Sequence, residues 1–325
     1  MTTTEAAQVA AVVRGDLRSA ARLISRIEAH DPAAQAVLAA LHAQHRQTPV
    51  FGLTGPPGAG KSTLVDQLLA HLRRDGLRVA VLAVDPSSPF SGGAILGDRV
   101  RMARHNTDSG VFIRSMAARG SLGGLSRATG DALTVLGAMG WDAIIVETVG
   151  VGQSEIDILR HADSVVILQT PVTGDVLQAV KAGLLEVGDI FVLNKVDAPG
   201  ADRALSGLRE AIEFRAHALP PDAWHTPLLK TQAVDGAGVD ALLHALWAHQ
   251  THLEAHPDQA LARRRQQVRA QVADCVSELL RDNQQTLMNN PGIGQLLDEV
   301  AQRRCAPMTA ARRLLGAEPV EQPHG

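Results

Sequence analysis

The sequence predicts an α/β protein in which a mostly parallel sheet is flanked by helices. Short β-branched runs alternate with helical segments from Pro49 onward, a pattern that indicates βαβ units. Runs such as AIIVE and SVVIL are apolar without alternation, which is typical of strands covered by helices on both faces. The expected strands are Val50–Thr54, Arg78–Val84, Val111–Ile113, Ala143–Val146, Ser164–Gln169, Ile190–Asn194 and Pro227–Lys230.

Helices are expected on the N-terminal side of this region. Residues 5 to 45 are rich in Ala, Leu and Arg at helical spacing. Asp31 is expected to cap a helix that has Pro32 at its first position. Together these features predict an N-terminal helical segment, 1–47. Its apolar face is expected to contain Leu17, Ala20, Ala21, Ile24 and Ile27.

The end of the chain is also expected to be helical. Val239–His249 is predicted to form one helix and about 251–283 a long second one, and two shorter helices end near Leu315. We therefore expect a sheet-containing domain over 48–250 and a C-terminal helical arm over 251–325.

Composition and charge exclude several classes of protein. The net charge is −3 over 325 residues, which favours neither nucleic acid nor an anionic membrane surface as a partner. No apolar run approaches the ~20 residues of a membrane span. The first 30 residues lack a leader pattern and contain Glu5, Asp16 and Glu28. Cys275 and Cys305 are not in a CxxC pair, so we expect free thiols in a reduced cytoplasm.

A phosphate-binding motif lies between the first strand and the next helix. Residues 55–63 read GPPGAGKST and match G-x-x-x-x-G-K-[ST] in full. Glycines let backbone N–H groups approach phosphate oxygens, and the helix N-terminus adds positive potential. Lys61 is expected to bridge the β- and γ-phosphates, and the Ser62 hydroxyl to ligate Mg²⁺. This motif indicates a P-loop NTPase whose phosphate contacts come from Gly55, Pro57, Gly58, Ala59, Gly60, Lys61, Ser62 and Thr63.

A second motif points to guanine as the base. Asn194, Lys195 and Asp197 follow an apolar strand and resemble the guanine-specificity motif of P-loop GTPases. A carboxylate at 197 accepts both N1–H and the exocyclic N–H of guanine, a donor pair that adenine lacks. The stretch that usually reads Ser-Ala has Gln232 and Ala233 here. We expect a backbone N–H of that stretch to contact guanine O6.

Three carboxylates are candidates for the magnesium site. Asp85 ends a strand that we expect beside the P-loop strand, and Asp98 lies in the loop that follows. Glu147 ends the apolar strand AIIVE and is the expected Walker-B acid. Because Mg²⁺ keeps several water ligands, not all three can bind it directly. Either Asp98 or Asp85 is expected near the metal, one of them through water.

The residues after Glu147 predict slow hydrolysis. The amide of Gly150 is expected to sense the γ-phosphate. Ras-like GTPases have a water-orienting glutamine directly after that glycine, but this chain has Val151 there and Gln153 two residues later. We expect weak intrinsic GTP hydrolysis that a partner accelerates, with Gln153 as the candidate catalytic side chain.

Taken together, the motifs resemble the MeaB/ArgK-type GTPases, relatives of the human methylmalonic aciduria type A protein. The segments that carry the resemblance are GPPGAGKST (55–63), VDPSSPFSGGAILGDRVRM (84–102), FIRSMAARGSLGGLSRAT (112–129), ETVGVGQSE (147–155) and NKVD (194–197). GDLRSAARLISRIE (15–28) and MTAARRLL (308–315) also look like the family.

The resemblance implies a G-protein chaperone for an adenosylcobalamin-dependent acyl-CoA mutase. It implies a homodimer formed partly through the C-terminal dimerisation arm, and cobalamin that is handled by the partner rather than bound tightly here. A nucleotide-responsive segment matches Thr173–Gly188 by position, with Asp175, Gln178 and Lys181 as its polar residues. An ordinary crossover helix there is the alternative. Methylmalonyl-CoA mutase and relatives such as 2-hydroxyisobutyryl-CoA mutase both remain possible partners.

Three other functions fit parts of the sequence. A nickel- or other metal-insertion GTPase usually has a Cys- or His-rich ligand cluster, which this sequence lacks. A small-molecule P-loop kinase needs a phosphoacceptor pocket, which no motif identifies. A scaffold without turnover is disfavoured by Lys61, Ser62 and Glu147.

Overall fold

The computed structural model describes residues 2–44, 47–85, 102–105, 107–117, 122–148, 161–171, 184–290 and 292–316. The chain divides into two compact units, unit 1 (Met1–Gln271) and unit 2 (Val272–Gly325).

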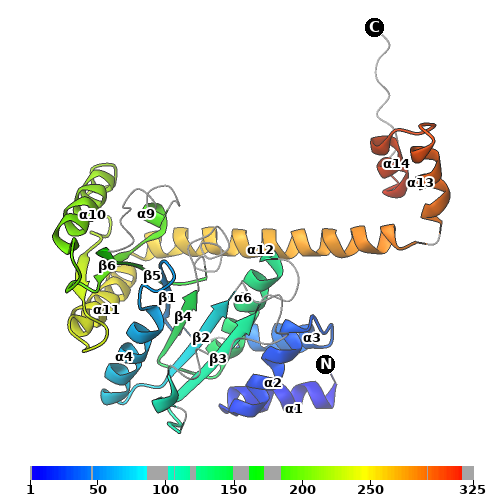
Figure 1. Ribbon diagram of the computed structural model, residues 1–325. Coiled ribbons are helices and arrows are strands. Elements are labelled where there is room, and N and C mark those ends of the chain that lie inside the picture. Colours follow the sequence, from blue (N-terminus) through cyan, green and yellow to red (C-terminus); the bar gives the residue numbers. More distant parts are fainter. Residues whose placement is uncertain are drawn as a thin grey trace. The chain divides into compact units, whose positions relative to one another are not determined.

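Unit 1 is built on a seven-stranded sheet with strand order β3-β2-β4-β1-β5-β6-β7 (Figure 1). Every neighbouring pair is parallel. All seven expected strands are confirmed. Their bounds are β1 (Val50–Thr54), β2 (Val79–Asp85), β3 (Val111–Ala117), β4 (Ala143–Thr148), β5 (Ser164–Gln169), β6 (Ile190–Asn194) and β7 (Leu228–Thr231). The strands β1, β4, β5 and β6 are buried along almost their whole length, as continuous apolar runs predict.

The neighbour expected for the Asp85 strand was wrong. β2 pairs with β3 and β4, and β4 rather than β2 lies beside the P-loop strand β1. β4 carries Glu147, so this carboxylate is one strand from the P-loop. Asp85 is two strand spacings away, about 10 Å.

Two layers of helices cover the sheet (Figure 1). On one face α4 (Lys61–Arg74) and α11 (Val239–Ala255) contribute to a hydrophobic cluster that includes Phe51 and Leu53. On the other face α6 (Leu122–Ala138) and α10 (Ala201–Ala216) join a second cluster. The short elements η1 (Ala103–His105) and α9 (Leu184–Val187) lie in the connections.

The N-terminal helices belong to the same core. α1 (Thr3–Val13), α2 (Leu17–Glu28) and α3 (Ala34–His42) pack with α6. Ala20, Ile24 and Ile27 are buried, as their spacing predicted, and Leu17 and Ala21 pack partly buried beside them. Because these helices share a core with the sheet, they form part of unit 1.

Two helix starts differ from the expectation. The Asp31 carboxylate accepts the N–H of Ala33 at 2.9 Å as an N-cap does, but the regular helix begins at Ala34. Near the C-terminus the break lies at His256–Pro257 instead of near residue 250. The proline explains this second shift, because it has no N–H for the preceding helix and favours a first-turn position in the next.

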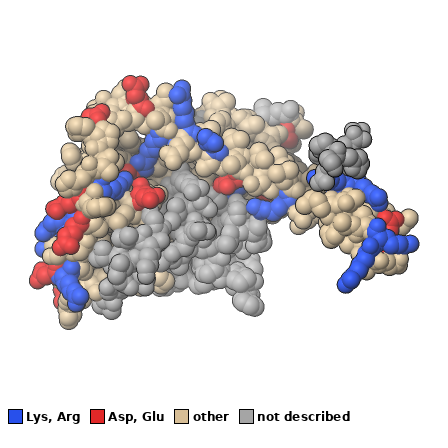
Figure 2. Space-filling model, turned by 90° about the horizontal axis from the view of Figure 1, so that it is seen from above, with Lys and Arg blue, Asp and Glu red and all other residues tan. Residues whose placement is uncertain are grey.

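The C-terminal helices are α12 (Pro257–Met288), α13 (Ile293–Ala301) and α14 (Pro307–Leu314). α12 begins in unit 1 and ends in unit 2. Of the helices in the described ranges, none is both long and apolar enough to cross a membrane. Figure 2 shows basic and acidic side chains scattered over a mostly uncharged described surface, in line with the small net charge.

Candidate nucleotide site

The P-loop joins the end of β1 to the start of α4. Gly58 and Gly60 have φ values of 75° and 93°, which favour glycine. A Cβ at Gly60 would lie 2.5 Å from the Asn194 side-chain nitrogen, and one at Gly55 would lie 2.3 Å from the Leu168 carbonyl oxygen. Both positions therefore require glycine for space. The backbone of the loop therefore lies directly against the ends of β5 and β6.

Lys61 places its ammonium group inside this loop. Its Nζ donates hydrogen bonds to the carbonyl oxygens of Gly55 at 2.7 Å and Pro56 at 3.0 Å. Lys61 is buried although it is the first residue of α4. A fixed cation and a helix N-terminus at one loop form a site suited to a phosphate anion.

A hydroxyl and a carboxylate meet beside the loop. Ser62 Oγ donates to Glu147 Oε1 at 2.7 Å, and both side chains are buried. They come from α4 and from the neighbouring strand β4. Hard oxygen donors of this kind suit Mg²⁺, so the pair fits the magnesium site that the sequence predicts.

Asn194 connects three segments at the base end of the site. Its Nδ2 donates to the carbonyl oxygen of Ala59 in the P-loop at 2.7 Å. Its Oδ1 accepts hydrogen bonds from Thr231 Oγ1 at 3.1 Å and from the Ala233 N–H at 3.0 Å. Asn194 is only 2% exposed, so its three hydrogen bonds are shielded from water. Thr231 begins the stretch Thr231-Gln232-Ala233 that the sequence assigns to the base, but no role for its side chain was predicted.

The other residues expected at the base lie near this hub. Lys195 and Asp197 are exposed, and Lys195 has a φ of 58°. The N–H of Gln232 donates to the carbonyl oxygen of Ala237 at 3.0 Å. The N–H of Ala233 already donates to Asn194 Oδ1, so a contact with guanine O6 would have to share this N–H between the two oxygens.

Asp98, Gly150, Gln153, Asp175, Gln178 and Lys181 lie outside the described residues. Asp85 pairs through its backbone with Ala117 at the end of β2. In the P-loop itself, Pro57, Gly58 and Thr63 are exposed and Ala59 is buried.

A family model described as methylmalonyl-CoA mutase-associated GTPase MeaB matches residues 20–289. The chain belongs to the MeaB family. It is therefore a P-loop GTPase, as the P-loop and the guanine motif predict. A putative GTPase of Pyrococcus abyssi is 42% identical over 302 residues, which covers 93% of each chain. GTPase ArgK of Escherichia coli is 37% identical over 283 residues, 85% of this chain and 83% of ArgK.

Two further similarities extend this comparison. The mitochondrial methylmalonic aciduria type A homolog of Mus musculus is 37% identical over 220 residues, 66% of this chain and 52% of the mouse protein. The crystal structure of a LAO/AO transport system kinase covers 97% of this chain and 98% of its own, with 28% identity and a TM-score of 0.62. Among the described residues of this MeaB-family chain, no group of three or more His, Cys, Asp or Glu could hold a metal ion.

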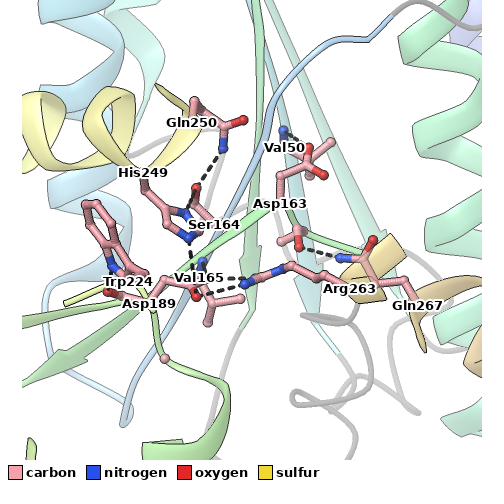
Figure 3. Close-up of polar contacts among 12 residues, drawn as sticks. Val50, Asp163, Ser164, Val165, Asp189, Trp224, His249, Gln250, Arg263 and Gln267 are labelled. Atoms are coloured by element: carbon pink, nitrogen blue, oxygen red, sulfur yellow. Dashed lines mark hydrogen bonds and ion pairs between the residues drawn. The ribbon is translucent and has the colours of Figure 1, made fainter. Parts of the chain in front are cut away.

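A second polar cluster lies at the amino ends of the strands, where β5 and β6 begin (Figure 3). Asp189 forms a two-point ion pair with Arg263 of α12, at 2.8 and 2.7 Å, and accepts the N–H of Val165 at 2.8 Å. Gln267, one turn further along α12, donates to the carbonyl oxygen of Ala162 at 2.8 Å. These contacts fix the first half of α12 to the sheet.

Ser164, His249 and Asp189 in this cluster resemble a hydrolytic triad only in composition. Gln250 donates to Ser164 Oγ at 2.8 Å, and Ser164 Oγ shares a hydrogen bond with His249 Nδ1 at 2.7 Å. His249 Nε2 lies 3.6 Å from Asp189, too far for a hydrogen bond. Ser164 and His249 are at most 1% exposed, which closes them to a substrate. Burial lowers the pKa of His249 to about 4, so it is neutral at pH 7.

Proposed function

We propose that this MeaB-family GTPase binds GTP with Mg²⁺ and uses hydrolysis to gate an adenosylcobalamin-dependent acyl-CoA mutase. The gated step is the loading, protection or reactivation of the mutase. The buried Ser62–Glu147 contact beside Lys61 carries the nucleotide half of this proposal. The family description, which names a methylmalonyl-CoA mutase-associated GTPase, supports the other half.

Ser62 and Glu147 are the residues that would hold magnesium, with Asp98 or Asp85 nearby. When bound, the ion supplies positive charge to the β- and γ-phosphates. Lys61 adds a second fixed cation, and the P-loop amides orient the phosphate chain. Asn194 holds the guanine loop against the P-loop, so that base recognition by Asp197 and phosphate binding form one rigid site.

Turnover is proposed to depend on the partner. Val151 cannot orient a water molecule, and Gln153 is the side chain assigned to that task once the mutase is bound. Cobalamin stays with the mutase. Methylmalonyl-CoA mutase or a close relative, such as 2-hydroxyisobutyryl-CoA mutase, is the partner, and both proteins act in the cytoplasm without nucleic acid or membrane.

The arm is proposed to join two copies of the chain. The part of α12 that belongs to unit 2 exposes Val272, Val276, Leu279 and Leu280, an apolar set at helical spacing that water does not favour. A second copy presents the same surface, which suits a symmetric dimer. Light scattering should show a dimer for the wild type and a monomer for V276E/L279E.

The central test is GTP turnover with and without a purified adenosylcobalamin-dependent mutase. The mutase is expected to raise the rate at least tenfold, and K61A should show no turnover in either case. In a parallel pull-down from the native extract, the chain loaded with a non-hydrolysable GTP analogue should recover the mutase, and K61A should not. Recovery of only nickel enzymes, with no mutase effect on turnover, would replace this function with metal insertion.

A further inference from the structure

Two buried threonines connect the ends of the P-loop strand and the Glu147 strand. Thr148 Oγ1 donates to Thr54 Oγ1 at 2.9 Å, and it lies 3.4 Å from the carbonyl oxygen of Leu53. Both threonines are 0% exposed. The β1–β4 backbone ladder ends with the pairing of Leu53 and Glu147, so the hydroxyl contact links the two strands one residue further on.

This hydroxyl contact lies on the opposite face of the sheet from the nucleotide contacts. Successive residues of a strand point to opposite faces. Ile145 belongs to the cluster on the α4 face, as does Leu53, whereas Ile144 and Val146 belong to the cluster on the α6 face. Glu147 therefore points to α4 and Ser62, and Thr148 points to the α6 side.

The pair sits directly behind the two groups that define the phosphate end of the site. Thr54 precedes Gly55, whose carbonyl oxygen accepts from Lys61 Nζ. Thr148 follows Glu147, which accepts from Ser62 Oγ. A shift between the ends of β1 and β4 would change the distance from Glu147 to the P-loop. The buried hydroxyl contact resists such a shift, because water cannot replace the hydrogen bond that the two threonines would lose.

We propose that the Thr148–Thr54 hydroxyl pair is a positioning element that holds Glu147 in register with Ser62 for magnesium-dependent nucleotide binding and hydrolysis. Neither threonine touches the nucleotide. The pair acts through the spacing of two strand ends. The inference rests on the proposed magnesium site.

The variant T148V keeps the shape of the side chain and removes the hydroxyl. We expect the Mg²⁺ concentration that half-saturates retention of fluorescent GDP to rise about fivefold, which corresponds to about 1 kcal/mol. Affinity for GDP in EDTA should stay unchanged. The kcat for GTP should fall five- to tenfold with an unchanged KM, and T148S, which restores the hydroxyl, should recover both values.

T48V is the matched control. Thr48 is a buried threonine whose hydroxyl donates to the Trp141 carbonyl oxygen at 3.0 Å, just before β1 at the other end of the strand. T48V should lower the melting temperature about as much as T148V does, and its GDP retention should depend on Mg²⁺ as in the wild type. If T148V does not fold, T54V tests the same contact from the other strand. The double variant T54V/T148V should lose no more Mg²⁺ affinity than the single variant that loses more.

Three outcomes would count against the inference in different ways. A wild-type protein whose GDP retention ignores Mg²⁺ overturns the magnesium site and the positioning role together. A wild type that depends on Mg²⁺, with T148V showing the same dependence and only a lower melting temperature, overturns the positioning role alone. Loss of GDP affinity in EDTA would show that the hydroxyl pair supports the whole P-loop rather than the Glu147 register.

Discussion

Replacing Asn194 with alanine removes the hub that joins the guanine loop to the P-loop. The change leaves the Ala59 carbonyl, the Thr231 hydroxyl and the Ala233 N–H without their present partner. All three residues are buried, at 3% exposure or less. At about 1 kcal/mol for each lost contact, the free energy of unfolding should fall by about 3 kcal/mol.

The same loss should weaken nucleotide binding. GDP must then bring the two disconnected loops together as it binds, and an ordering cost of up to about 3 kcal/mol corresponds to a rise of up to about a hundredfold in the Kd for GDP. Urea denaturation without nucleotide measures the first effect, and titration with fluorescent GDP measures the second.

D197A provides the control for this prediction. Asp197 is exposed and lies three residues from Asn194, so its removal should change the unfolding free energy by less than about 0.5 kcal/mol. It should nevertheless reduce the preference for GDP over ADP, because the carboxylate is the proposed guanine acceptor. If N194A unfolds at the same urea concentration as D197A, the hub does not hold these loops together and the reasoning is refuted.

Three further outcomes are expected. E147Q keeps an acceptor for Ser62, so it should bind GDP normally in EDTA, while its GTP turnover, measured by phosphate release, falls at least a hundredfold. The buried His249 has a lowered pKa in the folded state, so below pH 6.5 protons bind the unfolded chain more tightly than the folded one. Up to about 3 kcal/mol of the free energy of unfolding should therefore be lost between pH 6.5 and pH 4. In urea denaturation H249Q should lose less stability over this range than the wild type, and an equal loss in both proteins would contradict the assignment. R263M breaks the partly buried ion pair between α12 and Asp189 and should cost up to about 3 kcal/mol, whereas R265M, on an exposed position of the same helix, should unfold like the wild type.

The positions of the strands could be predicted because each is a contiguous apolar run. Ser164–Gln169 and Ile190–Asn194 begin and end at the expected residues, since burial on both faces leaves a continuous signal in the sequence. The strand order left no such signal. β4 lies between β1 and β2, and this depends on how the crossover helices pack rather than on any one segment.

The C-terminal helix break shows a different limit. The apolar spacing of 239–255 continues past the point where a boundary was expected, and the helix ends only where Pro257 begins the next one. The ion pair between Arg263 of α12 and Asp189 joins residues 74 positions apart. Its partners have no common motif, so no pattern in the chain could have predicted it.

The sequence by itself determined the P-loop, the guanine motif, the seven strands and the family, because each depends on residues that are adjacent or regularly spaced in the chain. Only the tertiary structure decided which strand lies beside the P-loop, that Ser62 meets Glu147 across 85 positions, and that Thr148 meets Thr54 across 94. These contacts depend on the register between distant segments, which is set when the two faces of the sheet are buried together.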